Sequence, residues 1–170
     1  MRLFGDAPAR SAEATLRLYA GVGSGSVLIA DGYEPYNRVA KANKLVHLAC
    51  WAHCRRYFFD ALQALPKDKR SPEQLAVRFM DLIAKLYEVE SVARTEGIDA
   101  HVLTLRRQEQ SVPVLKKIEA LLLANLHAVA PRTLLGQALH YAAGQWSKPE
   151  RFVLAGKHPI DNNASANSIR

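Results

Sequence analysis

The chain has 170 residues, of which 49% are hydrophobic and 23% are charged, so it is too apolar for a disordered protein and suits one domain, or one domain with an inserted subdomain. Its 23 Lys and Arg exceed its 16 Asp and Glu, and the net charge of +7 favours polyanionic partners such as nucleic acid. With only two cysteines the chain has no disulfide framework. Its most apolar stretch, residues 120–130, is too short to cross a bilayer. Both features predict a cytoplasmic protein without membrane contact.

Strand and helix signals alternate over the first third of the chain. An apolar run at residues 27–30 stops at Asp31 and Gly32, which predicts a buried strand that ends in a turn. Because a helical segment and a second apolar run follow, we expect an α/β unit with parallel strands. The expected elements are a short helix at 11–20, strands at 27–30 and 45–50, and a helix at 33–43.

Helical stripes replace the strand signals after Trp51, and they predict the packed core of a helical subdomain. Ser71, Pro72 and Gln74 match a helix start in which Ser caps, Pro takes the first position and Gln completes the capping box. Pro113 is expected to break or kink its helix, because it lacks an amide hydrogen. The predicted helices cover residues 53–65, a segment from 71, a segment from about 99, and residues 133–145.

Asp31 is the first candidate for chemistry. It follows the C-terminal end of a predicted buried strand, which is where α/β sheets place their ligands. A carboxylate at this point could hold Mg²⁺, a hard cation that prefers oxygen ligands. The alternative is an Asp-Gly turn without chemistry.

Two histidines and two cysteines, His47, Cys50, His53 and Cys54, lie within eight residues and suggest a zinc site. Their spacing argues against it. Cys50 lies in a predicted strand, whose successive side chains face opposite ways, and a second, distant pair of ligands is missing. We therefore expect buried thiols and no structural zinc.

Polar side chains at two places are candidates for contacts with DNA phosphates. His53, Arg55 and Arg56 come at a predicted helix start, where backbone N–H groups also attract anions, although a solvated helical turn is the alternative. The second group lies near the end of the chain, where helix capping is the default role of Asn and Asp, and where Asn clusters with a trailing Arg also suit the polar wall of a site. It comprises Asp161, Asn162, Asn163, Asn167 and Arg170, of which Asn163, Asn167 and Arg170 are the candidates for DNA binding.

Taken together, these motifs resemble those of the insertion-sequence-66 transposase family. Residues 31–37, DGYEPYN, are similar to its DGY…YN segment, and residues 50–59, CWAHCRRYFF, to its CWAH.RR.FF motif. Residues 160–170, IDNNASANSIR, are similar to its IDNNAAENAIR segment. Further residues in family order are Leu86, Tyr87, Glu90, Arg106, Arg107, Gln108, Glu109, Trp146, Arg151 and Phe152.

The resemblance implies an α/β fold with a partial RNase H-like core and a large all-helical insertion. It implies a partial core at residues 1–60, the insertion at 61–158, and at 159–170 the start of the core helix that carries the third acid. Such sites hold two Asp and one Glu around two ions of Mg or Mn, which stabilise the attacking and leaving oxygens of a phosphodiester. The implied partners are DNA, as element ends and target, and further transposase copies in a homo-oligomer, in a bacterial, nucleoid-associated location.

In this resemblance Asp31 corresponds to the second acid, a catalytic residue and metal ligand. Ala166 stands at the position of the Glu and offers no ligand atom. The first Asp has no counterpart, because the chain is expected to begin at the third strand. We therefore expect a transposase catalytic-domain fragment for DNA cleavage and strand transfer that is inactive alone and binds no metal stably. The alternatives are a non-enzymatic DNA-binding remnant and a helical interaction protein without a nucleic-acid role.

Overall fold

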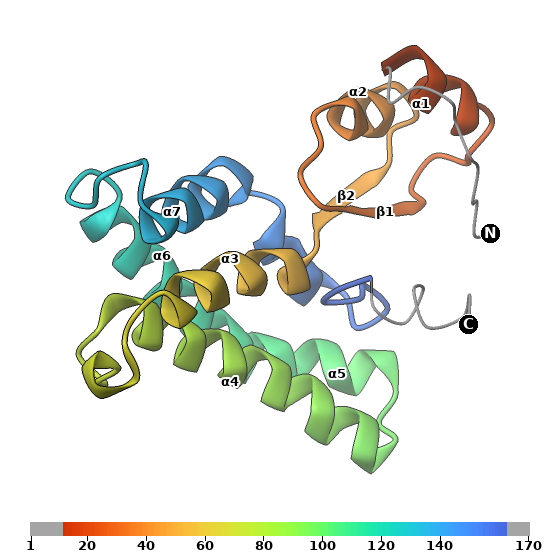
Figure 1. Ribbon diagram of the computed structural model, residues 1–170. Coiled ribbons are helices and arrows are strands. Elements are labelled where there is room, and N and C mark those ends of the chain that lie inside the picture. The colour runs from red at the N-terminus through yellow and green to blue at the C-terminus, as the bar shows by residue number, and fades with distance from the viewer. Residues whose placement is uncertain (1–11, 163–170) are drawn as a thin grey trace.

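The computed structural model describes residues 12–162, which form a small α/β unit beside a larger body of helices (Figure 1). The small unit contains α1 (Ala12–Leu18), β1 (Val27–Ala30), α2 (Pro35–Ala42) and β2 (Val46–Ala49). The body contains α3 (Trp51–Gln63), η1 (Lys67–Lys69), α4 (Leu75–Glu96), α5 (Ala100–Arg106), η2 (Arg107–Ser111), α6 (Val112–Asn125), α7 (Leu134–Gln145) and η3 (Pro149–Leu154).

The two strands pair in parallel, with Val27 opposite Val46 and Ala30 opposite Ala49. Their apolar sequences and the helical crossover α2 explain this pairing, since parallel neighbours need a crossover between them. The predicted strands and their parallel direction are therefore confirmed. Both strands end at the same edge of the sheet, which we call the carboxyl edge, and the chain continues there into Asp31 after β1 and Cys50 after β2.

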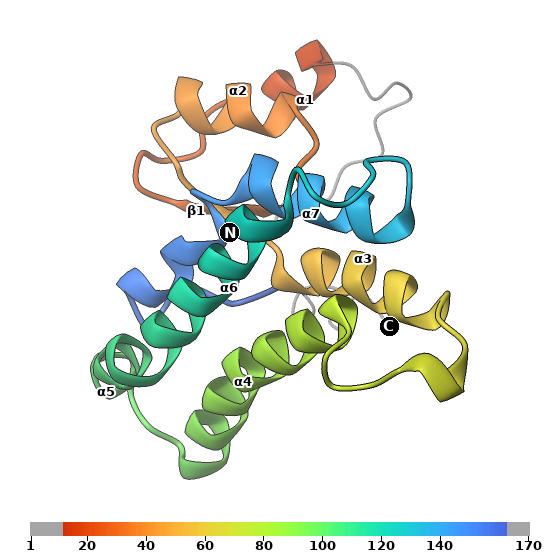
Figure 2. The ribbon, with the colours of Figure 1, turned by 90° about the vertical axis from the view of Figure 1, so that its left-hand side faces the viewer.

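The main core lies in the helical body, where α3 packs against both α4 and α7 (Figure 2). Large apolar side chains such as Phe58 and Phe79 are fully buried there, and these two rings stack with centroids 4.2 Å apart. Trp51 is also fully buried, and its indole Nε1 donates to the Pro149 carbonyl at 2.9 Å. A buried Trp needs such a partner, and this bond joins the start of α3 to η3.

The start of α4 differs from the predicted one. The helix begins at Leu75 with Gln74 as its N-cap, and Gln74 offers no side-chain cap. The backbone N–H of Gln74 instead closes a turn on the Ser71 carbonyl at 3.0 Å, and the Gln74 ψ of 130° takes the chain off the helical path. The prediction that Ser71 caps this helix is therefore wrong, because its carbonyl closes a separate turn.

Pro113 does not break the helical path; it lies in the first turn of α6 and follows the π-helical turn η2. Proline cannot donate to the carbonyl four residues earlier, and a π turn is a common way to absorb that missing bond. The predicted disturbance at Pro113 is thus a change of helical register that turns Arg107 and Ser111 into the interior.

The Asp99 side chain caps the start of α5 by accepting from the Val102 N–H at 2.9 Å.

Candidate functional site

Asp31 lies one residue beyond β1, at the carboxyl edge, as its position in the sequence predicts. Its side chain is exposed, and Oδ1 accepts a hydrogen bond from the Tyr33 N–H at 3.2 Å, which is the pattern of an Asx turn. Gly32 has a φ of +93°, a conformation that favours glycine. A Cβ at Gly32 would also lie 2.9 Å from Nε2 of Gln145. The turn therefore fixes the backbone of Asp31 and leaves its carboxylate facing outward.

The C-terminal part of α7 and the turn after it cover the Asp31 turn with three polar residues spaced at helical intervals. The Tyr141 hydroxyl donates to the Asp31 carbonyl at 2.7 Å, and Gln145 packs on Gly32. Lys148 Nζ donates to Gln145 Oε1 at 2.8 Å. Burial, with smaller effects of Cys54 and Asp31, raises the pKa of Tyr141, so its hydroxyl remains a donor at neutral pH. These residues were missed in the sequence analysis, although Tyr141, Gln145 and Lys148 recur at helical spacing in the last turn of α7 and just beyond it.

The end of β2 receives a segment from the far end of the described chain. The Cys50 thiol donates to Asn162 Oδ1 at 3.1 Å, and the Trp51 N–H donates to the Ile160 carbonyl at 3.1 Å. The Tyr87 hydroxyl of α4 donates to Asp161 Oδ2 at 2.9 Å. Residues 160–162 thus lie beside the start of α3 (Figure 1). The helical body leaves the sheet at the carboxyl edge and returns to it.

The first turns of α3 place the predicted basic residues unequally. Arg55 is exposed on the flank near Tyr87: burial, Asp161 and Cys50 raise the pKa of Tyr87, and the charge of Arg55 partly offsets that rise. Arg56 is exposed and lies about 100° further around the helix. His53 is half-buried, and its Nδ1 is buried without a hydrogen-bond partner among residues 12–162. The structure therefore places Arg55 near residues 160–162, and Arg56 lies on the adjoining exposed face of α3.

Four other predicted site residues, Asn163, Ala166, Asn167 and Arg170, lie outside the described residues.

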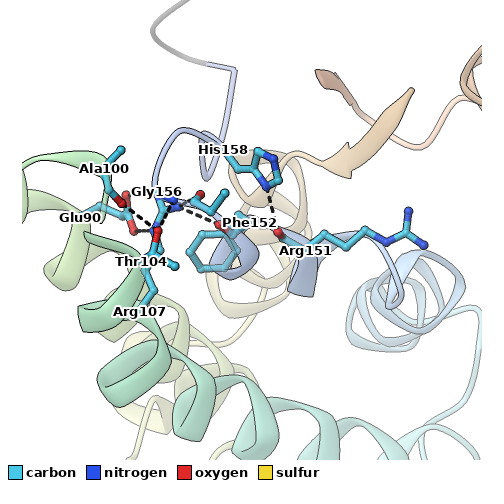
Figure 3. Close-up of polar contacts among 9 residues, drawn as sticks. Glu90, Ala100, Thr104, Arg107, Arg151, Phe152, Gly156 and His158 are labelled. Atoms are coloured by element: carbon cyan, nitrogen blue, oxygen red, sulfur yellow. Dashed lines mark hydrogen bonds and ion pairs between the residues drawn. The ribbon is translucent and has the colours of Figure 1, made fainter. Parts of the chain in front are cut away.

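A buried ion pair holds η3 and the residue that follows it, upstream of residues 160–162 (Figure 3). The Arg107 side chain is 1% exposed, and its Nε and Nη2 each donate to the Glu90 carboxylate at 2.7 Å. Its Nη1 donates to the carbonyls of Phe152 and Ala155 at 2.7 and 2.8 Å. The guanidinium also lies over the Phe152 ring, 5.0 Å from its centroid. One side chain from η2 thereby links α4 to η3 and to the chain that follows η3.

A close backbone contact secures the same segment two residues before His158. The Gly156 N–H donates to Thr104 Oγ1 at 2.7 Å (Figure 3). A Cβ at Gly156 would meet the Ala100 carbonyl at 2.0 Å, so this approach requires glycine. His158 Nδ1 lies 3.3 Å from the Arg151 carbonyl and tightens the loop. These contacts set the direction in which residues 160–162 reach the carboxyl edge.

The two cysteines do not resemble metal ligands. Both are free and buried, and burial, with a smaller effect of Cys50, raises the pKa of Cys54 to about 12. Zinc binds thiolates, so a thiol held protonated suits it poorly. Burial, with Lys148 and Arg151, lowers the pKa of His47 to about 4. Within residues 12–162 no group of three or more His, Cys, Asp or Glu side chains could hold a metal ion; the expectation that zinc is absent stays a prediction.

Two grooves elsewhere on the body are separate from this site. One, of about 620 Å³, lies between α4 and α6, and the other, of about 450 Å³, lies between α6 and η3. Asp31 lines neither of them.

Among the described helices none is both long enough and apolar enough to cross a membrane.

Comparison with known proteins gives a family match over the whole chain. The family profile described as "Transposase IS66 family" matches residues 1–170. Two relatives from Sinorhizobium fredii (strain NBRC 101917 / NGR234), the uncharacterised proteins y4jD and y4qI, are 29% and 30% identical over 168 residues. Each alignment covers 95% of this chain but only 30% and 29% of the relative, so the chain spans less than a third of their length. No solved structure matches.

Proposed function

Because the chain belongs to the IS66 transposase family, we propose that it is a fragment of a transposase catalytic domain, serves DNA cleavage and strand transfer, and is inactive alone. In this proposal the carboxyl edge is the surface that faces DNA, and Asp31 is its catalytic carboxylate. Residues 1–60 form a partial RNase H-like core, 61–158 a helical insertion, and 159–170 begin the core helix that carries Ala166.

The observation that carries the proposal is the return of the chain to the sheet. The helices from α3 to η3 begin at Trp51, directly after Cys50, and end at Leu154. The chain then reaches Asn162, whose side chain accepts a hydrogen bond from the Cys50 thiol. An insertion into a core domain must leave and re-enter that core at neighbouring points. This arrangement supports an insertion that leaves the core near the carboxyl edge and returns to it. The proposed boundary at residue 60 falls within α3, which packs on α4 and α7 of the helical body.

Charge around the carboxyl edge supports DNA as the partner. The chain carries a net charge of +7, and Arg55 and Lys148 lie near the two strand ends. Basic groups contact DNA mainly through its phosphates, which position a strand without reading its sequence. His53, Arg55 and Arg56, together with Asn163, Asn167 and Arg170, are our proposed DNA contacts.

The metal ions of the family, Mg or Mn, have few ligands among the described residues. Asp31 offers one exposed carboxylate, and the Asp161 carboxylate is bonded to Tyr87. Two ions need several carboxylates to fix their separation and offset their charge. Residues 12–162 therefore do not form a two-metal site by themselves. With Ala166 at the position of the family's Glu, this supports a chain that does not catalyse alone.

The proposal predicts DNA binding without cleavage. The chain should bind duplex DNA at low salt, and the logarithm of its affinity should fall linearly with the logarithm of salt concentration as counterions are released. A supercoiled plasmid bearing the element ends should stay uncut in Mg²⁺ or Mn²⁺. Ala166→Glu alone should not restore cleavage, because Asp31 and one Glu remain too few carboxylates for two ions.

Two results would contradict this proposal in different ways. Cleavage by the unaltered chain that Asp31→Asn abolishes would show a complete catalytic site. Absence of DNA binding at low salt would remove the role in transposition and favour a helical interaction protein.

A further inference from the structure

Two aromatic side chains on α3 are exposed to nearly the same extent, Tyr57 at 39% and Phe59 at 40%. They differ in their surroundings. The Tyr57 ring stacks on the ring of Tyr141 from α7, with centroids 4.5 Å apart and an angle of 23° between the planes. Tyr141 covers one face of the Tyr57 ring, so the accessible area belongs to the rest of that ring.

The stacked pair is joined directly to the candidate catalytic turn. The Tyr141 hydroxyl donates to the Asp31 carbonyl at 2.7 Å. Gln145, one helical turn after Tyr141, packs on Gly32 and accepts from Lys148. The Tyr57 ring is therefore joined to the end of β1 through one residue, Tyr141, which stacks on Tyr57 and bonds Asp31. A group bound on Tyr57 would lie close to whatever faces Asp31.

We propose that the Tyr57–Tyr141 pair is a stacking platform for an unpaired nucleobase of the DNA strand whose phosphate faces Asp31. This inference rests on the proposed function, which makes DNA the ligand of the carboxyl edge. An aromatic ring accepts any base, because every base has a π-face. A ring already held by a second ring loses little freedom when the base arrives. Lys148 supplies a cation beside the same turn for the adjoining phosphate.

The platform favours single-stranded or frayed DNA over a closed duplex. Bases inside a duplex are already stacked on their neighbours, whereas a strand end can offer a free face. A protruding exposed aromatic could instead bind an apolar protein surface, and a DNA-binding measurement separates the two roles.

The test is binding of the full chain to a short single strand that carries 2-aminopurine, whose fluorescence is quenched on stacking. Tyr57→Ala and Tyr57→Leu should weaken binding by roughly fivefold to a hundredfold and remove the quenching. Tyr57→Phe should retain both, since it keeps the ring. Phe59→Ala is the matched control, because it removes an equally exposed ring from the same helix and should change neither signal. Leucine at position 57 in the Tyr57→Leu variant still covers the Tyr141 ring. Weaker binding by this variant would therefore not reflect exposure of the protein core.

The outcomes of this test separate the platform from the proposed function. Equal loss in Tyr57→Ala and Phe59→Ala, or equal loss in Tyr57→Phe and Tyr57→Ala, would contradict it. Normal binding by Tyr57→Ala would also contradict it and leave the proposed function intact. Absence of binding to single strands and to duplex by the unaltered chain would contradict the proposed function first. Loss confined to Tyr57→Ala and Tyr57→Leu supports the platform.

Discussion

Arg107 illustrates how one side chain can organise a large part of this molecule. All three of its nitrogens have partners: two bond the Glu90 carboxylate and one bonds two backbone carbonyls. A planar guanidinium with a rigid fork of donors can satisfy such a set, whereas a lysine ammonium cannot reproduce the paired geometry. Glu90 and Arg107 follow the family order in sequence, and in the structure they hold the chain that returns to the carboxyl edge.

Loss of the Arg107 guanidinium should cost about 3–5 kcal/mol of unfolding free energy, because Glu90, only 10% exposed, would keep a buried unpaired charge. The substitution is Arg107→Met, measured by urea unfolding. Arg106→Met is the matched control: its pair with Glu96 is 23% and 47% exposed and should contribute no more than about 1 kcal/mol. Similar losses in the two variants would show that the buried pair has no special weight.

Elements defined by local pattern were predictable from the sequence. The apolar run at residues 27–30 forms β1 with the bounds expected, and Thr133 caps α7 by accepting from the Gly136 N–H at 3.0 Å. Asp31 likewise falls where the end of a strand predicts it. Each of these signals depends on neighbours within a few residues along the chain.

The remaining features depend on contacts between distant segments. The bonds of Tyr141 to Asp31 and of Cys50 to Asn162 join residues 110 and 112 positions apart. No local periodicity records such a pairing. The prediction that α4 starts at Ser71 was wrong for another reason: the Ser71 carbonyl closes a turn that the capping pattern does not indicate. The position of the candidate site was therefore predictable at Asp31, whereas its surroundings were not.

Two glycines test how tightly the elements pack. Gly156→Ala should destabilise the protein by about 1–3 kcal/mol, because its Cβ would overlap the Ala100 carbonyl at the start of α5. Gly144→Ala lies within α7 with nothing within 4 Å of the added Cβ and should stabilise by about 0.5–1 kcal/mol. Thermal unfolding of both variants gives the comparison. A neutral Gly156→Ala would mean that the loop after η3 does not pack on α5 as described.

At the scale of the whole molecule, a two-stranded sheet is joined to a much larger helical body. Two strands alone are marginal in water, and a parallel sheet is ordinarily covered on both faces. Here α1 and α2 form a small core on the sheet around Leu28 and Val39, while the main core lies among α3, α4, α6 and α7. The helical body meets the small unit at the carboxyl edge and also along β2, where η3 packs and Arg151 donates to the His47 carbonyl.

The proposed DNA-binding surface of the molecule is the carboxyl edge of the sheet. Hydrogen exchange of the chain, measured with and without a DNA fork that has a single-stranded end, tests it most directly. We expect slower exchange in the turn after β1, in the first turn of α3 and at residues 160–162, and unchanged exchange in the first turns of α4, which begins at Leu75. Protection confined to the groove between α4 and α6, or no protection at any DNA concentration, would contradict it.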